Sequence, residues 1–266
     1  MANDTLRRLR INSWASFERR VRDRSPNLLV ELPKYPDAVL VAGCQRSGTT
    51  AITRILRDAI GMPNLCLTSD DELDAALLLS GIATSEYSGR HCFQTTYLND
   101  RVCEYFEHDD FRLVWIIRNP QSVVQSMLYN WRYGALVRLF KRCGSRGLGE
   151  RERKLFDRFG SLPFSRLQMA CLSYNAKTAQ TQLLAEQLGQ DRLFIVDYDE
   201  LVDRREEILP RIFDFANLPF DPAGLARLKR SSTSLKAKLN KRSVNYVDQA
   251  CCVEYARARR LAEIGS

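Results

Sequence analysis

The sequence predicts an α/β protein, a three-layer sandwich in which a mainly parallel central sheet is flanked by helices. Three short apolar runs rich in β-branched residues predict strands at 38–43, 111–118 and 192–198. The first two pass directly into stretches of helical periodicity, and a long helical segment, 165–188, precedes the third. Because strands that alternate with helices pair through right-handed crossovers, the sheet is expected to be parallel.

Length and composition indicate a single soluble globular domain over residues 1–266. A chain of 266 residues with 45% hydrophobic and 27% charged residues can bury a large core. These proportions exclude the disordered and fibrous classes.

The charge favours an anionic partner, since 40 basic residues face 32 acidic ones and the net charge is +8. A nucleotide, an acidic polymer or a membrane surface would each fit. The eight cysteines include no C-x-x-C pair, so we expect free thiols in a reducing compartment and no metal site. Without a run of about 18 apolar residues or a secretory leader, a cytoplasmic location is expected.

The N-terminal segment 5–24 predicts a basic amphipathic helix with seven arginines. Its apolar face contains Leu6, Leu9, Trp14, Phe17 and Val21. Such a helix can lie on an anionic membrane, as a peripheral contact, or pack on its own domain. Packing on the domain is the favoured interpretation.

The strongest motif is the run Gly43-Cys44-Gln45-Arg46-Ser47-Gly48-Thr49-Thr50, which joins the first strand to its helix. Backbone N–H groups and a helix N-terminus converge on an anion in such a turn. The spacing matches the phosphate loop G-x-x-x-x-G-K-S/T, which predicts a P-loop nucleotide-kinase-like fold, but Thr49 stands in place of the lysine. This difference argues against triphosphate hydrolysis, and the nearby cation is Arg46.

Two motifs in this order resemble the family of sulfotransferases that use 3'-phosphoadenosine-5'-phosphosulfate (PAPS). The segment QRSGTT resembles the family's 5'-phosphosulfate loop, and Arg118-Asn119-Pro120 with Ser126 resembles its 3'-phosphate element. The resemblance implies that the donor PAPS contacts Arg46, Ser47, Gly48, Thr49, Thr50, Arg118 and Ser126.

Weaker matches extend the resemblance over roughly 38–220. Asp197-Tyr198-Asp199-Glu200-Leu201 is similar to the family's Y-E-D-L segment and adds Tyr198 to the donor site, and 215–219 resembles its F-L-G-L-P stretch. The family's loop R-K-G-x-x-G is absent. An acid-free basic run, which includes Lys236 and Lys238, either caps the nucleotide or is a solvated tail.

The resemblance implies an in-line displacement that needs no metal. Charge spreads over equatorial oxygens and builds on the leaving 5'-phosphate oxygen, as in phosphoryl transfer. Arg46 is therefore assigned the electrophilic role, through charge-assisted hydrogen bonds to the sulfonate and the bridging oxygen.

The acceptor base is less well defined. Where many family members carry K-T-H, this chain has Gln94-Thr95-Thr96. Other branches use a glutamate 20 to 30 residues beyond the phosphate loop, which points to Glu72 in the acidic cluster 70–72. Asp70 and Asp71 can equally cap a helix, although Asp71 stays a candidate, and His91 is an alternative base.

Between the second and third strands, residues 132–158 form a basic insertion with nine Lys or Arg against three Glu or Asp. The insertion either guides an anionic acceptor or is a solvated helix pair, which is slightly favoured. Nearby aromatic residues either line an acceptor pocket or pack in a core, the commoner role at helical spacing. These aromatic residues are Trp131, Tyr133, Phe140, Phe156 and Phe159.

The expected activity is sulfuryl transfer from PAPS to a hydroxyl or amine of an acceptor such as a saccharide, peptide or small metabolite. Two alternatives stay open: an ATP-binding kinase-like protein on the same loop, and a non-catalytic binder of anionic surfaces. Nucleic acid is not an expected partner, because stacking motifs and a recognition helix are missing. The acceptor and the oligomeric state stay open.

Overall fold

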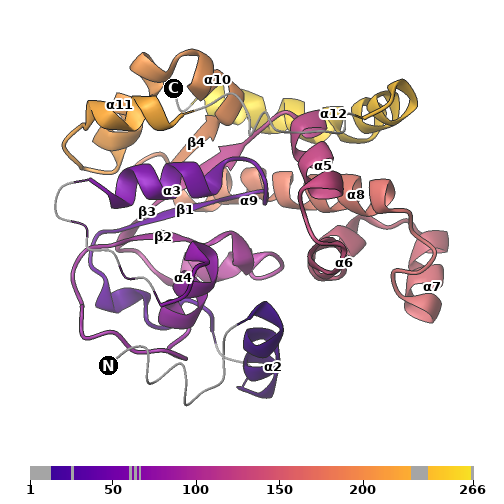
Figure 1. The fold of residues 1–266 in the computed structure, drawn as a ribbon, viewed down its shortest axis with the longest axis horizontal. Helices are drawn as coiled ribbons and strands as arrows, with labels where there is room; N and C mark the ends of the chain where they lie inside the picture. Colours follow the sequence, from indigo (N-terminus) through magenta and orange to yellow (C-terminus); the bar gives the residue numbers. More distant parts are fainter. Residues whose placement is uncertain are drawn as a thin grey trace.

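The protein was analysed as a computed structural model, which describes residues 13–24, 27–59, 62, 65, 67–228 and 239–264. Its centre is a four-stranded sheet in the order β2-β1-β3-β4, with all three neighbouring pairs parallel (Figure 1). The strands are β1 (Ala38–Gly43), β2 (Cys92–Gln94), β3 (Phe111–Ile117) and β4 (Leu193–Asp197).

Helices precede, connect and follow these strands. The α-helices are α2 (Trp14–Arg24), α3 (Thr49–Arg57), α4 (Asp71–Leu79), α5 (Pro120–Tyr129), α6 (Tyr133–Arg142), α7 (Glu150–Phe159), α8 (Arg166–Thr178), α9 (Gln180–Leu188), α10 (Tyr198–Asp203), α11 (Arg205–Phe215) and α12 (Lys241–Ile264). Short 3-10 helices are η1 (Leu32–Lys34), η2 (Thr96–Leu98), η3 (Val102–Glu107), η4 (Gly144–Gly147) and η5 (Pro222–Arg227).

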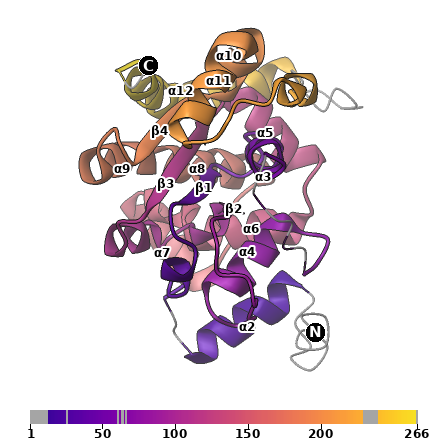
Figure 2. The ribbon, with the colours of Figure 1, turned by 90° about the vertical axis from the view of Figure 1, so that its left-hand side faces the viewer.

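The alternation of side chains along the buried strands defines the layers. Leu40 and Trp115 point to one face, where α2, α4, α9 and the end of α12 pack. Val41 and Ile116 point to the other face, which α3, α10 and α11 cover. Figure 2 shows α10 and α11 above the sheet and α2 and α4 below it. Both faces are covered because a parallel sheet exposes neither face to water.

A separate apolar cluster lies beyond the carboxyl end of β1 and holds α5, α6, α8 and α12 together. Phe140 is fully buried there and lies 5.6 Å from Phe156 and 5.1 Å from Phe164, between ring centroids. The segment 132–158 contains α6, η4 and all of α7 but its last residue. Phe140 belongs to the apolar cluster and Phe156 packs against it, so both aromatic side chains have a packing role. Tyr133 and Phe159 are about half exposed.

These observations confirm the predicted fold class. The structure adds the short strand β2 and divides the expected helix 165–188 at Ala179, the residue between α8 and α9. In α2, Phe17 is buried and its ring centroid lies 6.5 Å from that of Tyr97, and Trp14 Nε1 donates to Asp70 Oδ2 at 2.9 Å, so the described part of this helix packs on the domain. Leu6 and Leu9 lie outside the described residues.

The cysteines follow the expectation of free thiols over the described residues. Seven of the eight cysteines lie in the described residues, and all seven are free thiols. The structure buries five of them: Cys44, Cys92, Cys143, Cys171 and Cys251. Within the described ranges, no helix combines the length and the apolar character that crossing a membrane requires.

Candidate active site

The loop between β1 and α3 depends on two glycines with left-handed backbone angles. Gly43 has φ +133°, and a Cβ there would lie 2.1 Å from the carbonyl oxygen of Ile116. Gly48 has φ +105°, and its Cβ would lie 2.4 Å from the Tyr198 ring. Only glycine fits such positions, so the loop passes close to β3 and to the start of α10.

Internal hydrogen bonds fix the same loop. Ser47 is fully buried, and its hydroxyl donates to the Cys44 carbonyl at 2.6 Å. The side chain of Ser47 therefore secures the loop and does not line the cavity beside it. Gln45 donates to the Thr96 carbonyl at 2.9 Å and to Asn99 Oδ1 at 2.8 Å, which ties the loop to η2.

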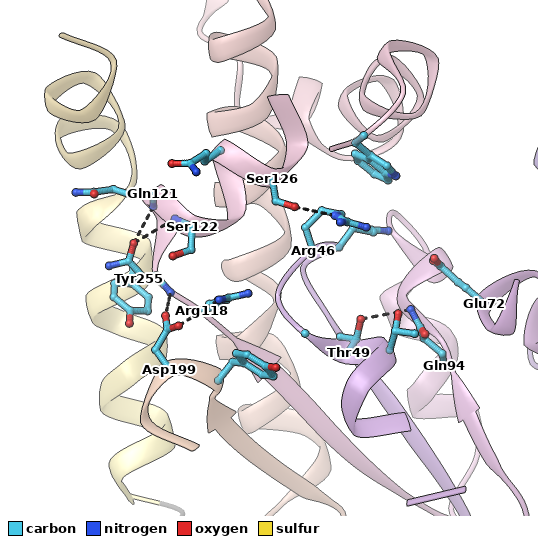
Figure 3. Close-up of a pocket in the computed structure, with 17 residues that line it drawn as sticks. Arg46, Thr49, Glu72, Gln94, Arg118, Gln121, Ser122, Ser126, Asp199 and Tyr255 are labelled. Carbon is cyan, nitrogen blue, oxygen red and sulfur yellow. Dashed lines mark hydrogen bonds and ion pairs between the residues drawn. The ribbon is translucent and has the colours of Figure 1, made fainter. Parts of the chain in front are cut away.

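The loop opens onto a cavity of about 900 Å³ at the carboxyl ends of the strands (Figure 3). In parallel α/β sheets this is the edge where ligands bind. The lining residues come from the loop, the start of α3, α4, β2, the two residues after β3, α5, the turn before α6, α10 and α12: Gln45, Arg46, Gly48, Thr49, Thr50, Glu72, Gln94, Arg118, Asn119, Gln121, Ser122, Gln125, Ser126, Trp131, Tyr198, Asp199 and Tyr255.

A second element meets the loop across this cavity. Arg118 follows β3 directly, and Asn119 caps α5 by accepting from the Gln121 amide at 2.9 Å. With Pro120 at the first helical position, the sequence starts a helix here and presents Ser126 from its second turn. Arg46 Nε donates to Ser126 Oγ at 3.0 Å, so the two predicted motifs adjoin each other (Figure 3).

Arg118 is held between an aromatic ring and a carboxylate. Its guanidinium carbon lies 4.7 Å from the centroid of the Tyr198 ring, and its Nε lies 3.1 Å from Asp199 Oδ1. Asp199 Oδ2 also accepts from the Asn119 amide at 3.2 Å. The segment after β4 thus holds the guanidinium of Arg118 in the wall of the cavity.

The cavity is electrostatically prepared for anions. Burial lowers the pKa of Arg46, and the positive charge of Arg118 lowers it further. Both side chains are nevertheless cationic at neutral pH, because a guanidinium keeps its proton in proteins. Two cations held near each other bind a polyanion favourably, since it relieves their repulsion.

Glu72 lies on the far side of Arg46 from Arg118 and Asp199 (Figure 3). Its side chain keeps some accessible surface because it faces the cavity, while surrounding protein atoms desolvate the carboxylate. Burial raises the pKa of Glu72 to about 7, the nearby Asp70 also raises it, and Thr96, Lys177 and Gln45 oppose the rise. A carboxyl group of this kind exchanges a proton near neutral pH.

The neighbouring aspartates have structural roles. Asp70 caps α4, because its Oδ1 accepts from the amides of Glu72 at 3.1 Å and Leu73 at 3.2 Å. Although burial raises the pKa of Asp71, hydrogen bonds from Arg57 at 2.6 Å and Arg54 at 2.8 Å lower it overall. Asp71 lies outside the lining of the cavity.

The structure does not bring His91 to this site. It precedes β2 at the amino end, is 3% exposed, and lines a small separate space with Arg57 and Asp71. Burial lowers the pKa of His91 to about 4, and Arg57 adds to the effect. Lys236 and Lys238 lie outside the described residues.

Several residues that line the cavity were not predicted as site residues from the sequence: Gln45, Gln121, Ser122, Gln125, Asp199 and Tyr255. Tyr255 comes from α12 and donates to Asp197 Oδ2 at 2.5 Å. Gln45 belongs to the motif QRSGTT and Asp199 to the segment 197–201, so their positions in these motifs could have indicated a place in the site. Within the described ranges, no cluster of three or more His, Cys, Asp or Glu side chains is arranged to hold a metal ion.

Comparison with known proteins identifies the class of this protein. The family model described as "Sulfotransferase domain" matches residues 36–259, so the chain belongs to the sulfotransferase domain family. No curated protein matches.

Solved structures with a similar fold are distant in sequence. The sulfotransferase domain from the curacin biosynthetic pathway is 15% identical, with a TM-score of 0.48 over 84% of this chain and 96% of that one. A sulfotransferase from Alicyclobacillus acidocaldarius is 15% identical, with a TM-score of 0.49 over 86% and 96%. Mouse sulfotransferase SULT7A1, complexed with PAP, is 12% identical, with a TM-score of 0.41 over 90% of each chain.

Proposed function

We propose that this protein transfers a sulfuryl group from PAPS to a hydroxyl or amine acceptor. The observation that carries the proposal is the 3.0 Å contact between Arg46 Nε and Ser126 Oγ, which joins the phosphate loop to the Arg118 element around one cavity. A nucleotide with phosphates at both its 5' and 3' positions has two separated anionic groups, and these two elements match such a pair.

In the proposed complex the two elements divide the donor between them. The loop amides, with Thr49 and Thr50, hold the 5'-phosphate at the N-terminus of α3. Arg118 and Ser126 hold the 3'-phosphate, with the Arg118 guanidinium oriented by Tyr198 and Asp199. Recognition of the 3'-phosphate distinguishes PAPS from ATP.

The proposed reaction is a single in-line displacement. A bond forms between the acceptor oxygen or nitrogen and sulfur, while the bond between sulfur and the 5'-phosphate oxygen breaks. Arg46 stabilises the charge that develops on the leaving oxygen. Glu72 accepts the acceptor proton, because at neutral pH a carboxyl group with a pKa of about 7 is partly ionised.

Thermal unfolding with added nucleotides tests the donor. We expect 3'-phosphoadenosine-5'-phosphate (PAP) to raise the melting temperature, and ADP and ATP–Mg²⁺ to raise it much less. A preference for ATP–Mg²⁺ would replace the proposal by the kinase-like alternative. Indifference to all three nucleotides would favour the non-catalytic binder of anionic surfaces.

A transfer assay tests the reaction itself. With radiolabelled PAPS and panels of phenols, saccharides, peptides and lipids, label is expected on one acceptor class, with PAP as the second product. Tight PAP binding without transfer to any panel would limit the proposal to nucleotide binding.

A further inference from the structure

Lys177 is a buried cation that the proposed reaction does not use. It lies in α8 and is 1% exposed. Its ammonium nitrogen lies 3.4 Å from the Thr96 carbonyl oxygen and 5.3 Å from the centroid of the Trp115 ring. Lysine is almost never fully buried unless its charge is compensated, so a side chain in this position calls for an anionic neighbour.

The contacts of Lys177 lead to Glu72. The Thr96 carbonyl that faces Lys177 also accepts from Gln45 Nε2 at 2.9 Å. Gln45 lines the cavity together with Glu72, and Thr96 and Gln45 lie near enough to the Glu72 carboxylate to lower its pKa. Lys177, Thr96 and Gln45 therefore form one connected group, which runs from the interior to the cavity beside Glu72.

We propose that Lys177 is a positioning residue: from the interior side of Thr96 it supplies the counter-charge that keeps Glu72 ionisable as a base. The inference rests on the proposed function, because it concerns the base of that reaction. Lys177 is outside the cavity lining and acts only through Glu72.

The charged groups around Glu72 have opposite effects on its pKa. Asp70, at the start of α4, raises the pKa of Glu72, and Lys177, from α8, lowers it. Arg46 lines the same cavity from the loop. Burial keeps Tyr97 and Tyr105 uncharged by raising the pKa of each phenol.

Lys177 itself is buried, and burial lowers its pKa. Cys143, Cys44, Glu72 and Asp100 act in the opposite direction and favour its charged form. Of these groups, Glu72 is the carboxylate that lines the cavity. Loss of the Lys177 charge would leave the buried Glu72 carboxylate facing Asp70 without its buried counter-ion.

PAP affinity, measured by calorimetry from pH 5.5 to 9, tests this inference without any acceptor. An ionised Glu72 repels PAP, so the affinity of the wild type should fall relative to Glu72→Gln as pH rises through about 7. The ratio of the two affinities cancels the titration of the PAP phosphates. Its midpoint reports the ionisation of Glu72.

Neutral variants should displace this midpoint. Each substitution at position 177 is made in the wild type and in Glu72→Gln, so that each midpoint comes from a matched pair. In Lys177→Met and Lys177→Gln we expect a midpoint higher by on the order of one pH unit. Lys177→Arg, which keeps the charge, should stay near the wild-type value, and Asp70→Asn should move the midpoint to lower pH.

The outcomes separate the two proposals. PAP binding with an unchanged midpoint in folded neutral variants would overturn the role of Lys177 and leave the donor site standing. Failure of both neutral variants to fold would assign Lys177 a structural role and overturn the inference equally. A wild type that does not bind PAP would sink the proposed function first, and with it this inference.

Discussion

Arg46 combines a strained backbone with the proposed electrophilic side chain. Its φ of +75° lies in the left-handed region, where an L-residue other than glycine is destabilised by about 1–2 kcal/mol. The loop therefore keeps an arginine where glycine would be more stable. Such strain is common at functional sites.

Arg46→Gly should separate stability from activity. Relief of the strain should offset the lost hydrogen bond to Ser126, so the melting temperature is expected to stay within a few degrees of the wild type. Turnover should fall by about 10²–10³-fold and PAP affinity by less, because the guanidinium is used most in the transition state. Steady-state kinetics and calorimetry measure both quantities.

Arg46→Lys is the matched control, since it keeps the charge and loses the planar fork. Its turnover is expected between those of the wild type and Arg46→Gly. Equal losses of affinity and turnover in Arg46→Gly would contradict a specific role in the transition state.

Glu72 carries a stability cost that depends on pH. Its pKa is about 7 when folded, against an ordinary value of 4.5, so the folded state holds more protons between these limits. Stability therefore falls as pH rises from 4.5 to 7 and is constant above. Over this window the free energy of unfolding of Glu72→Gln should increase relative to that of the wild type by at most about 3 kcal/mol. Urea unfolding at several pH values would measure this difference.

At the scale of elements, the start of α5 and the end of β3 set donor selectivity. Arg118→Ala should weaken PAP binding about 10- to 100-fold and leave ADP binding nearly unchanged, because only PAP has a 3'-phosphate. Ser126→Ala should reduce the same preference by a smaller factor. Parallel loss of ADP affinity in Arg118→Ala would place this arginine at another phosphate. Circular dichroism checks that the variants fold.

The elements also show how far sequence reasoning reaches. Strands β1, β3 and β4 were predicted within a residue or two because each is a buried run bounded by polar residues. Strand β2 escaped because it has only three residues, Cys92–Gln94, too few for a periodic pattern. The break between α8 and α9 at Ala179 also has no glycine or proline to mark it.

The site residues also differ in whether local sequence or long-range packing determines their position. Motif spacing brought Arg46, Gly48, Thr49, Arg118 and Ser126 to one cavity because a phosphate loop and a strand end are local features. Long-range packing decided the rest. The sequence alone did not reveal that Lys177 would approach Thr96, 81 residues away, or that His91 would lie apart.

For the whole molecule, the buried His91 predicts weaker folding in acid. Its pKa is about 4 when folded and 6.5 ordinarily, so below pH 6.5 the unfolded state binds the extra proton. This histidine therefore lowers stability as pH falls from 6.5 to 4, by at most about 3 kcal/mol. His91→Phe, which keeps a ring beside Phe93, should lose this component in denaturation measured across that range. An unaltered pH dependence would contradict it.

The all-parallel sheet has a consequence for synthesis of the chain. β1 pairs with β3, whose paired residues lie 73 positions later in sequence, and β4 follows some 80 residues after β3. No adjacent hairpin can nucleate this sheet, since parallel neighbours need long crossovers. The backbone edge of β3 that pairs with β4 therefore stays unpaired, beside the apolar side chains of β3, until residue 197 has emerged from the ribosome. During that interval it is open to aggregation, and chaperone binding would protect it.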